Sequence, residues 1–169
     1  MMLDDRIVEV RSLAKSFRDA LKGLIFCVKN ERNMRIHLTA AAYVLVFSVF
    51  YSLSGTQYIL LLGTICMVLF AETVNTSLEA VINMHTQCYD HLARIAKDVA
   101  AGAVLFCSFF AAVIGFILFL KPAIIIYILV FLFDEPVWGC LFLISLPLCA
   151  LFIFCWPHKA LKIARKRAH

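Results

Sequence analysis

Long apolar runs separated by short polar stretches dominate the pattern of this chain. The first run extends from Leu38 to Leu53, the second from Tyr58 to about Ile82, and the third from Val99 to Leu120. A fourth run extends from Val137 to Trp156. Because a membrane-spanning helix needs ~20 mostly apolar residues, each run with its flanks is long enough to cross a bilayer. We therefore predict an all-α integral membrane bundle, with three spans in a core from 37 to 120 and a fourth, C-terminal span.

An amphipathic pattern precedes the first span and defines an N-terminal region from 1 to 36. Between Arg6 and Arg35, apolar residues recur every three or four positions beside a second stripe of lysines and arginines. This spacing predicts one helix with an apolar face and a basic face. Such a helix suits the cytoplasmic surface of the membrane, where basic side chains meet anionic head groups. A solvated helix packed on a partner domain is the alternative.

An additional hydrophobic region from 121 to 169 follows the third span. Its first run, Ala123 to Phe133, has only 11 residues. Because that length is short for a spanning helix, we expect this run to be interfacial or re-entrant. The polar break Asp134–Pro136 then leads into the fourth span. Lysines and arginines cluster between Pro157 and His169, and such positive charge favours the cytoplasmic side of the membrane.

Composition supports the membrane prediction and narrows the choice of partners. Hydrophobic residues make up 63% of the 169 residues and charged residues 16%, and the mean hydropathy is +0.92. The net charge of +5 alone would allow a nucleic-acid partner. The 16 lysines and arginines, however, gather in short regions beside apolar runs, which is typical of cytoplasmic loops. We therefore expect a multi-pass protein of the cytoplasmic membrane, with its N-terminus inside and no nucleic-acid partner.

Two glutamates within the second span carry the strongest indication of chemistry. A charged side chain in hydrocarbon costs at least ~2.5 kcal/mol, so a carboxylate there needs an explanation. At about 100° per residue, Glu72, Asn75, Glu79 and Asn83 fall within ~80° on one helix face, which we call the polar seam. Interhelical hydrogen bonds worth ~0.6 kcal/mol each do not require carboxylates. We interpret the polar seam as a site for a hard cation and a hydroxyl, because Mg²⁺ prefers oxygen ligands.

Charged residues at neighbouring helix ends extend this candidate site. Lys97 and Asp98 stand at the start of the third span. A lysine there can contact phosphate oxygens, and an aspartate can orient that lysine or hold a second metal. A positive-inside anchor and a helix-start acid are the alternative. Glu31 and Arg35 lie where the surface helix meets the bilayer, and Glu31 either completes a metal site or is an ordinary solvated charge.

Four motifs in this order resemble a known family. They are Ser16–Phe17 with Ala20–Leu24, Asn30–His37, Glu72–Val81 and Ala96–Val104. On these residues the chain, from about Lys15 to Leu120, resembles the small prokaryotic membrane kinases, diacylglycerol kinase and undecaprenol kinase. The second and fourth motifs are more similar to the undecaprenol kinase branch.

The resemblance implies roles for individual residues. Glu72 matches the family's catalytic base, which takes the proton of a lipid hydroxyl. Glu31 and Glu79 match metal-binding glutamates, so Mg²⁺ is the implied cofactor and ATP the implied co-substrate. Nucleotide contacts are implied for Asp19, Glu31, Glu79, Lys97 and Asp98, and substrate contacts or support for Asn75, Asn83, Arg35 and Ala101. Members of the family are homotrimers with sites shared between neighbours, and we expect the same assembly here.

Three positions depart from the family pattern. Asn83 stands where the family usually has aspartate, so one negative charge near the nucleotide or metal is missing. Asp19 stands where an aromatic nucleotide contact is usual, and Ser12 where an arginine can occur. Residues 121 to 169 lie outside the resemblance.

The sequence therefore predicts an ATP-dependent lipid kinase acting on undecaprenol or diacylglycerol. A small transporter or proton-coupled carrier, in which Glu72 and Glu79 relay ions, is one alternative, although it leaves Lys97 and Asp98 unexplained. A non-catalytic membrane scaffold is another. Label transfer from ATP supports the kinase, ion flux without ATP supports the carrier, and the scaffold predicts no nucleotide-dependent thermal shift.

Overall fold

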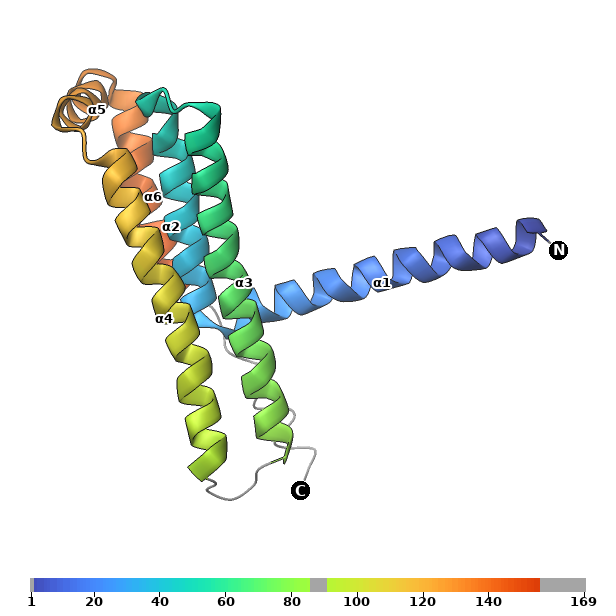
Figure 1. Ribbon diagram of the computed structural model, residues 1–169. Helices are drawn as coiled ribbons and strands as arrows, with labels where there is room; N and C mark the ends of the chain where they lie inside the picture. Colours follow the sequence, from blue (N-terminus) through green and yellow to red (C-terminus); the bar gives the residue numbers. More distant parts are fainter. Residues whose placement is uncertain (1, 86–90, 156–169) are drawn as a thin grey trace. The chain divides into compact units, whose positions relative to one another are not determined.

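The computed structural model describes residues 2–85 and 91–155, and every regular element in that part of the chain is helical (Figure 1). The elements are α1 (Met2–Asn30), α2 (Arg32–Ser48), the 3₁₀ helix η1 (Val49–Tyr51), α3 (Gly55–His85), α4 (His91–Phe119), α5 (Pro122–Asp134) and α6 (Pro136–Phe154). They form two compact units, of which the first contains α1 and the second contains α2 to α6.

Four helical segments of the second unit are long and apolar enough to cross a membrane. They are Arg32–Tyr51, Gly55–Met84, His91–Phe119 and Pro136–Phe154. Each segment contains most of one predicted span. Each also extends into polar residues beyond the apolar run at one or both ends. The predicted all-α integral membrane bundle is thus confirmed. Trp156 and the basic tail after Pro157 lie outside the described residues.

The boundary between α1 and α2 differs from the prediction. The amphipathic pattern predicted one helix continuing to Arg35, but α1 ends at Asn30 and α2 begins at Arg32. The Asn30 side chain donates from Nδ2 to the Phe26 carbonyl oxygen at 2.8 Å. Asparagine favours helix ends because its amide competes in this way with the backbone hydrogen bonds. The break falls in the polar stretch from Lys29 to Asn33, where no apolar residue shows whether the helix continues.

A short turn joins η1 to α3 and is held by reciprocal capping. The Ser54 N–H donates to Gln57 Oε1 at 2.8 Å, and the Gln57 N–H donates to Ser54 Oγ at 3.3 Å. This Ser-x-x-Gln arrangement satisfies two backbone donors at the start of a helix. Ser52 adopts a left-handed backbone with φ of 46°, which reverses the chain. Together these contacts direct α3 back along α2.

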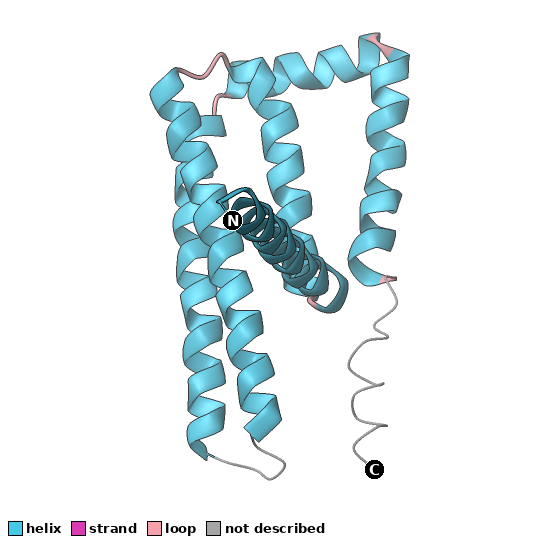
Figure 2. Cartoon of the chain, turned by 90° about the vertical axis from the view of Figure 1, so that its right-hand side faces the viewer, coloured by secondary structure: helices cyan, strands magenta, loops and turns pink. Residues whose placement is uncertain are grey.

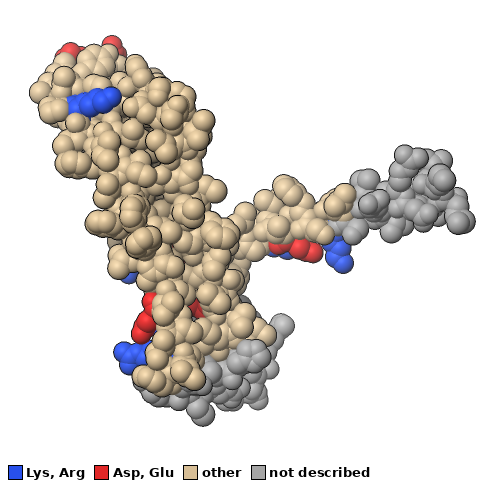
Figure 3. All heavy atoms as spheres, in the orientation of Figure 1, with Lys and Arg blue, Asp and Glu red and all other residues tan. Residues whose placement is uncertain are grey.

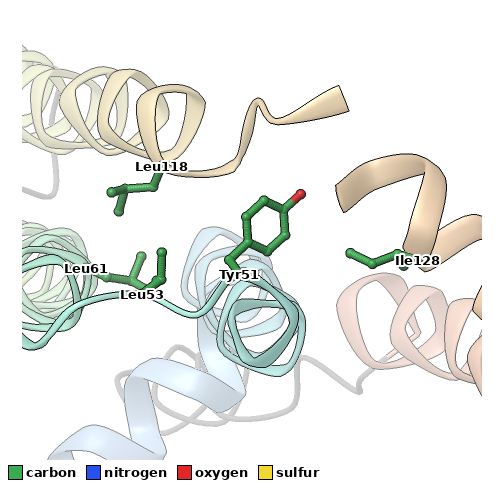
Figure 4. Packing of buried hydrophobic residues seen from close by; sticks show 5 residues of the cluster. All are labelled: Tyr51, Leu53, Leu61, Leu118 and Ile128. Atoms are coloured by element: carbon green, nitrogen blue, oxygen red, sulfur yellow. The ribbon is translucent and has the colours of Figure 1, made fainter. Parts of the chain in front are cut away.

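A cluster of buried apolar side chains holds the helix ends together beside this turn (Figure 4). Tyr51 and Leu53 come from η1 and the turn, Leu61 from α3, Leu118 from α4 and Ile128 from α5. The Tyr51 ring also meets Phe119 edge-on, with ring centroids 4.8 Å apart. This cluster lies at the opposite end of α3 from the polar seam, so it fixes the helices that carry the seam without taking part in it.

Two helices that lie crosswise to each other, α5 and α6, follow α4, and together we call them the C-terminal hairpin. The short helix α5 lies across one end of the bundle and leads into α6, which lies beside α2 (Figures 1 and 2). Pro122 and Pro136 occupy the first turns of α5 and α6, positions where proline's missing N–H costs no helical hydrogen bond. With 13 residues, or about 20 Å, α5 is shorter than a spanning helix. Gly139 allows α6 to approach α5 closely, because a Cβ there would overlap the Leu132 carbonyl oxygen.

Charged side chains of the second unit gather near the helix ends. On the face shown in Figure 3, red and blue atoms of α2 to α6 lie toward the two ends, with a broad apolar belt between them. Many large apolar side chains of α4 and α6 are exposed, including Phe109, Phe116 and Leu143 at 63%, 65% and 64%. A lipid environment accounts for such a surface, because hydrocarbon contacts apolar side chains without cost.

Candidate functional site

Glu72 is almost completely enclosed within the second unit. Its exposed fraction is 1%, and those of the neighbouring Asn75 and Thr76 are 6% and 4%. All three lie on α3, which packs along α4. Thr76 Oγ1 donates to the Glu72 carbonyl oxygen at 2.9 Å, so this threonine hydroxyl is used within the helix. The structure therefore holds the Glu72 carboxylate away from bulk water. Burying a carboxylate in apolar surroundings has a large free-energy cost, so its presence there indicates a functional role.

The polar seam continues one turn beyond Glu72. Asn75 Nδ2 donates to Glu79 Oε1 at 3.2 Å, which joins two of the predicted site residues. Glu79 is half-buried. The other polar atom of the amide, Asn75 Oδ1, is buried and accepts no hydrogen bond from the described residues. One carboxylate and one amide oxygen thus lie together with acceptor capacity for a further donor or a cation.

A contact between α3 and α4 closes the polar end of the seam. Lys97 Nζ donates to Asn83 Oδ1 at 2.7 Å. Sequence reasoning placed both residues in the site but did not predict that they bind each other. The contact could have been suspected from the sequence, because the two residues lie near the helix ends that flank a single loop. Because Asn83 is neutral, this bond fixes the Lys97 ammonium without neutralising its charge, so the cation keeps its attraction for phosphate.

Asp98 and Ala101 lie further along α4, on exposed positions. Asp98 Oδ2 is 3.9 Å from Arg94 Nε, and both side chains are largely exposed, at 73% and 67%. An ion pair of this length between exposed groups contributes little stability. The predicted nucleotide contact of Asp98 and the supporting role of Ala101 stay predictions.

Arg35 takes a position that sequence reasoning did not anticipate. Its side chain is fully buried, with an exposed fraction of 0%. Nε and Nη2 donate to the carbonyl oxygen of Ile153 in α6, at 3.2 and 3.1 Å. The C-terminal end of a helix presents unpaired carbonyls and partial negative charge, which a buried guanidinium satisfies well. The predicted substrate role of Arg35 stays a prediction, and its observed contact joins α2 to the C-terminal hairpin.

Two predicted site residues belong to the first unit. Asp19 accepts a hydrogen bond from Lys22 Nζ at 2.7 Å, between side chains that are both mostly exposed. The Glu31 backbone N–H donates to the Cys27 carbonyl oxygen at 2.8 Å, a helical hydrogen bond at the C-terminal end of α1. The nucleotide contact of Asp19 and the metal contact of Glu31 stay predictions.

The oxygen atoms of the polar seam are of the kind that bind a magnesium ion. Carboxylate and amide oxygens, as in Glu79 and Asn75, are the hard ligands that Mg²⁺ takes, together with water and phosphate oxygens. Within the described ranges, no group of three or more His, Cys, Asp and Glu side chains is arranged to hold a metal ion. A metal at this site would therefore take few ligands from the second unit, which is common for Mg²⁺ that is shared with a nucleotide.

An apolar slot of about 290 Å³ opens between α2, α3 and α4. Its α3 wall includes Val68 and Leu69, and Val68 stands one helical turn before Glu72 on the same face. Three polar side chains, His37, Thr64 and Ser108, interrupt the apolar lining. Ser108 Oγ is buried and has no hydrogen-bond partner among the described residues. The apolar cavity therefore ends along α3 about one helical turn before Glu72.

Comparisons with known proteins agree with the resemblance. Residues 18–119 match the model of a family described as prokaryotic diacylglycerol kinase. A diacylglycerol kinase of Synechocystis sp. is 38% identical over 112 residues, which are 66% of this chain and 64% of that relative. An undecaprenol kinase of Bacillus subtilis is 32% identical over 112 residues, which are 66% of this chain and 91% of that relative. The match thus spans just under two thirds of the Synechocystis protein's length.

The family match covers α2, α3 and α4 and the C-terminal part of α1 from residue 18, and it ends where α4 ends. The helices α5 and α6 lie beyond it. Both relatives bear the names of kinases, and neither name supports the transporter alternative. This chain belongs to the prokaryotic diacylglycerol kinase family.

Proposed function

We propose that this protein transfers the γ-phosphoryl group of ATP to the hydroxyl of a membrane lipid alcohol, undecaprenol or diacylglycerol. One observation carries the proposal: the carboxylate of Glu72 is enclosed inside an apolar helical bundle, with an exposed fraction of 1%. It lies about 16 Å along α3 from Asn83 at the polar end of the seam. A base at this depth can meet a hydroxyl that a lipid presents from the membrane, and a nucleotide can approach from the polar end.

Glu72 would act as the general base. Its carboxylate takes the proton of the lipid hydroxyl while that oxygen forms a bond to the γ-phosphorus, and the bond from phosphorus to the bridging oxygen of ADP breaks. The products are the phosphorylated lipid, ADP and the proton on Glu72.

The rest of the seam would bind the nucleotide. Glu79, oriented by Asn75, would hold a Mg²⁺ ion, which neutralises phosphate charge when bound. Lys97, held by Asn83 at 2.7 Å, would contact the phosphate oxygens as a point charge. These groups position the triphosphate so that its terminal phosphorus points toward Glu72.

The apolar slot would receive the hydrocarbon part of the lipid. Its position beside Glu72 along α3 allows a chain inside the bundle and a hydroxyl at the carboxylate to belong to the same molecule. A slot of about 290 Å³ holds part of one chain and leaves the remainder in the bilayer. Because both candidate alcohols present long apolar chains, the slot is compatible with either.

The proposal places the protein in the cytoplasmic membrane, with the polar end of the seam on the cytoplasmic side, where ATP is present. Lysines and arginines near that end, such as Arg94 and Lys97, agree with this orientation. We also propose a homotrimer, in which residues of neighbouring subunits complete each site.

A phosphoryl-transfer assay tests the function directly. The purified protein in lipid vesicles is incubated with Mg²⁺ and γ-labelled ATP, with undecaprenol or diacylglycerol as acceptor. The proposal predicts label in the lipid fraction with at least one acceptor. If neither alcohol is labelled while the same vesicles transport ions without ATP, the protein is a carrier and the proposal is wrong.

A further inference from the structure

Ser108 lies level with Glu72 across the contact between α3 and α4. These two helices lie side by side and run in opposite directions (Figures 1 and 2). The hydrogen bond from Lys97 Nζ to Asn83 Oδ1 fixes their register. Counted from that bond, Glu72 stands 11 residues along α3 and Ser108 stands 11 residues along α4, each about 16 Å away. Because the helices are antiparallel, equal distances bring the two residues to the same depth.

Ser108 also lies on the face of α4 that meets α3. At about 100° per residue, an interval of 11 residues is about 20° more than three full turns, so Ser108 shares a helix face with Lys97. The same interval places Glu72 and Asn83 on one face of α3. Val104, one turn before Ser108, is buried, which agrees with this orientation. Glu72 and Ser108 therefore stand on facing sides of the two helices.

The hydroxyl of Ser108 is not used within its own helix. In α3, the hydroxyls of Thr64, Thr73 and Thr76 each donate to the backbone carbonyl oxygen four residues earlier, at 2.6, 2.8 and 2.9 Å. Ser108 Oγ is buried and has no such partner among the described residues. An unpaired buried hydroxyl has a free-energy cost that alanine, present at Ala111 on the same slot wall, avoids. A serine at position 108 therefore indicates a partner that this chain does not itself supply.

The apolar slot leads to Ser108. Ser108 lines the slot together with Val68, which stands one turn before Glu72. Of the other polar lining residues, Thr64 has its hydroxyl bonded within α3, and His37 is partly exposed. A lipid whose chain occupies the slot would carry its polar end past Ser108 to reach Glu72. Ser108 Oγ would meet that polar end by turning between staggered side-chain rotamers.

We propose that Ser108 is a second residue that holds the acceptor hydroxyl of the lipid, an inference that rests on the proposed kinase function. The lipid hydroxyl donates a hydrogen bond to Glu72 and accepts one from Ser108 Oγ, so both contacts fix the direction of its remaining lone pair. That lone pair forms the bond to the γ-phosphorus while the bond from phosphorus to the bridging oxygen of ADP breaks. The lipid proton passes to Glu72, and Ser108 keeps its own proton throughout. Orienting the attacking oxygen in this way favours the reactive geometry.

Phosphoryl transfer by Ser108→Ala tests this role. The full chain in lipid vesicles is assayed with Mg²⁺, γ-labelled ATP and, in turn, undecaprenol, diacylglycerol and an ester-free dialkylglycerol. We expect kcat/KM for the lipid to fall about tenfold, the effect of one lost hydrogen bond, while KM for ATP and the thermal unfolding midpoint keep their wild-type values. Ser77→Ala is the matched control, because the exposed Ser77 donates from Oγ to the Val74 carbonyl oxygen. It should transfer phosphate at the wild-type rate.

Two larger side chains at the same position separate the hydroxyl from its shape. Ser108→Thr keeps a hydroxyl and Ser108→Val has the same shape without one, so the threonine variant should be several-fold more active than the valine variant.

Each other outcome overturns the inference in a distinct way. An active wild type with equal rates in Ser108→Ala leaves the kinase function intact and shows that Ser108 does not contact the lipid. A loss with diacylglycerol but not with dialkylglycerol places Ser108 at an ester carbonyl and not at the reacting hydroxyl. A wild type that labels none of the three alcohols refutes the kinase function, and this role of Ser108 with it.

Discussion

Replacement of Arg35 with alanine is expected to loosen the C-terminal hairpin from α2. Arg35 is fully buried, and its Nε and Nη2 donate to the Ile153 carbonyl oxygen at 3.2 and 3.1 Å. The contact joins residues 118 positions apart in the chain. Alanine removes both donors and the aliphatic part of the side chain, and it leaves the Ile153 carbonyl without the guanidinium.

The expected loss of stability follows from these contacts. A hydrogen bond to a charged group contributes about 1.5–3 kcal/mol, and since both donors share one acceptor we count it once. The two buried methylene groups that alanine lacks, Cγ and Cδ, contribute roughly 1.6 kcal/mol at about 0.8 kcal/mol each. The alanine variant also avoids the desolvation cost of burying the guanidinium charge, and this offsets part of the loss. We therefore expect Arg35→Ala to lower the free energy of unfolding by about 3 kcal/mol.

Reversible unfolding in mixed detergent, followed by circular dichroism, measures this change. Arg32→Ala is the matched control, because Arg32 is exposed at the start of the same helix and should change stability by no more than ~0.5 kcal/mol. If Arg35→Ala and Arg32→Ala unfold at the same detergent fraction, the Arg35 contact does not hold α6 and the reasoning is wrong.

Three further predictions concern the nucleotide site, the hairpin and the metal. Lys97→Gln should raise the KM for ATP about tenfold or more with little change in kcat, because a charged phosphate contact of at least ~1.5 kcal/mol is lost, whereas Lys121→Gln at the other helix end should not. Gly139→Ala should destabilise the protein by about 1–3 kcal/mol in the same unfolding assay, since its methyl group meets the Leu132 carbonyl oxygen; Gly115→Ala, which meets nothing within 4 Å, should not destabilise it. Chelation with EDTA should stop phosphoryl transfer and added Mg²⁺ should restore it; activity that persists in EDTA would refute the metal site.

The four spans were predictable because hydrophobicity over a sufficient length is a property of the local sequence. The seam was predictable for the same reason: Glu72, Asn75 and Glu79 share a helix face whatever the rest of the chain does. Their burial followed from the cost of a carboxylate in hydrocarbon, which favours an enclosed position.

Contacts between distant segments were not predictable. The bond of Arg35 to Ile153 uses a backbone carbonyl, which leaves no mark on the sequence, and Arg35 was interpreted as a site residue because it stands beside Glu31 in a family motif. The bond between Lys97 and Asn83 depends on how α3 and α4 pack, which periodicity does not determine. The break after Asn30 was missed because it falls among the polar residues from Lys29 to Asn33, where the apolar pattern carries no information.

The rate of phosphoryl transfer in Glu72→Gln tests the central claim most directly. Glutamine keeps the shape of the side chain but cannot accept the hydroxyl proton, so transfer from γ-labelled ATP to the lipid alcohol should fall by about 10²–10⁴-fold, the usual contribution of a general base. ATP binding, measured by a nucleotide-dependent thermal shift, should stay close to wild type, and Glu135→Gln, at an exposed glutamate between α5 and α6, should keep full activity. A Glu72→Gln protein that transfers phosphate within twofold of the wild-type rate would contradict the account.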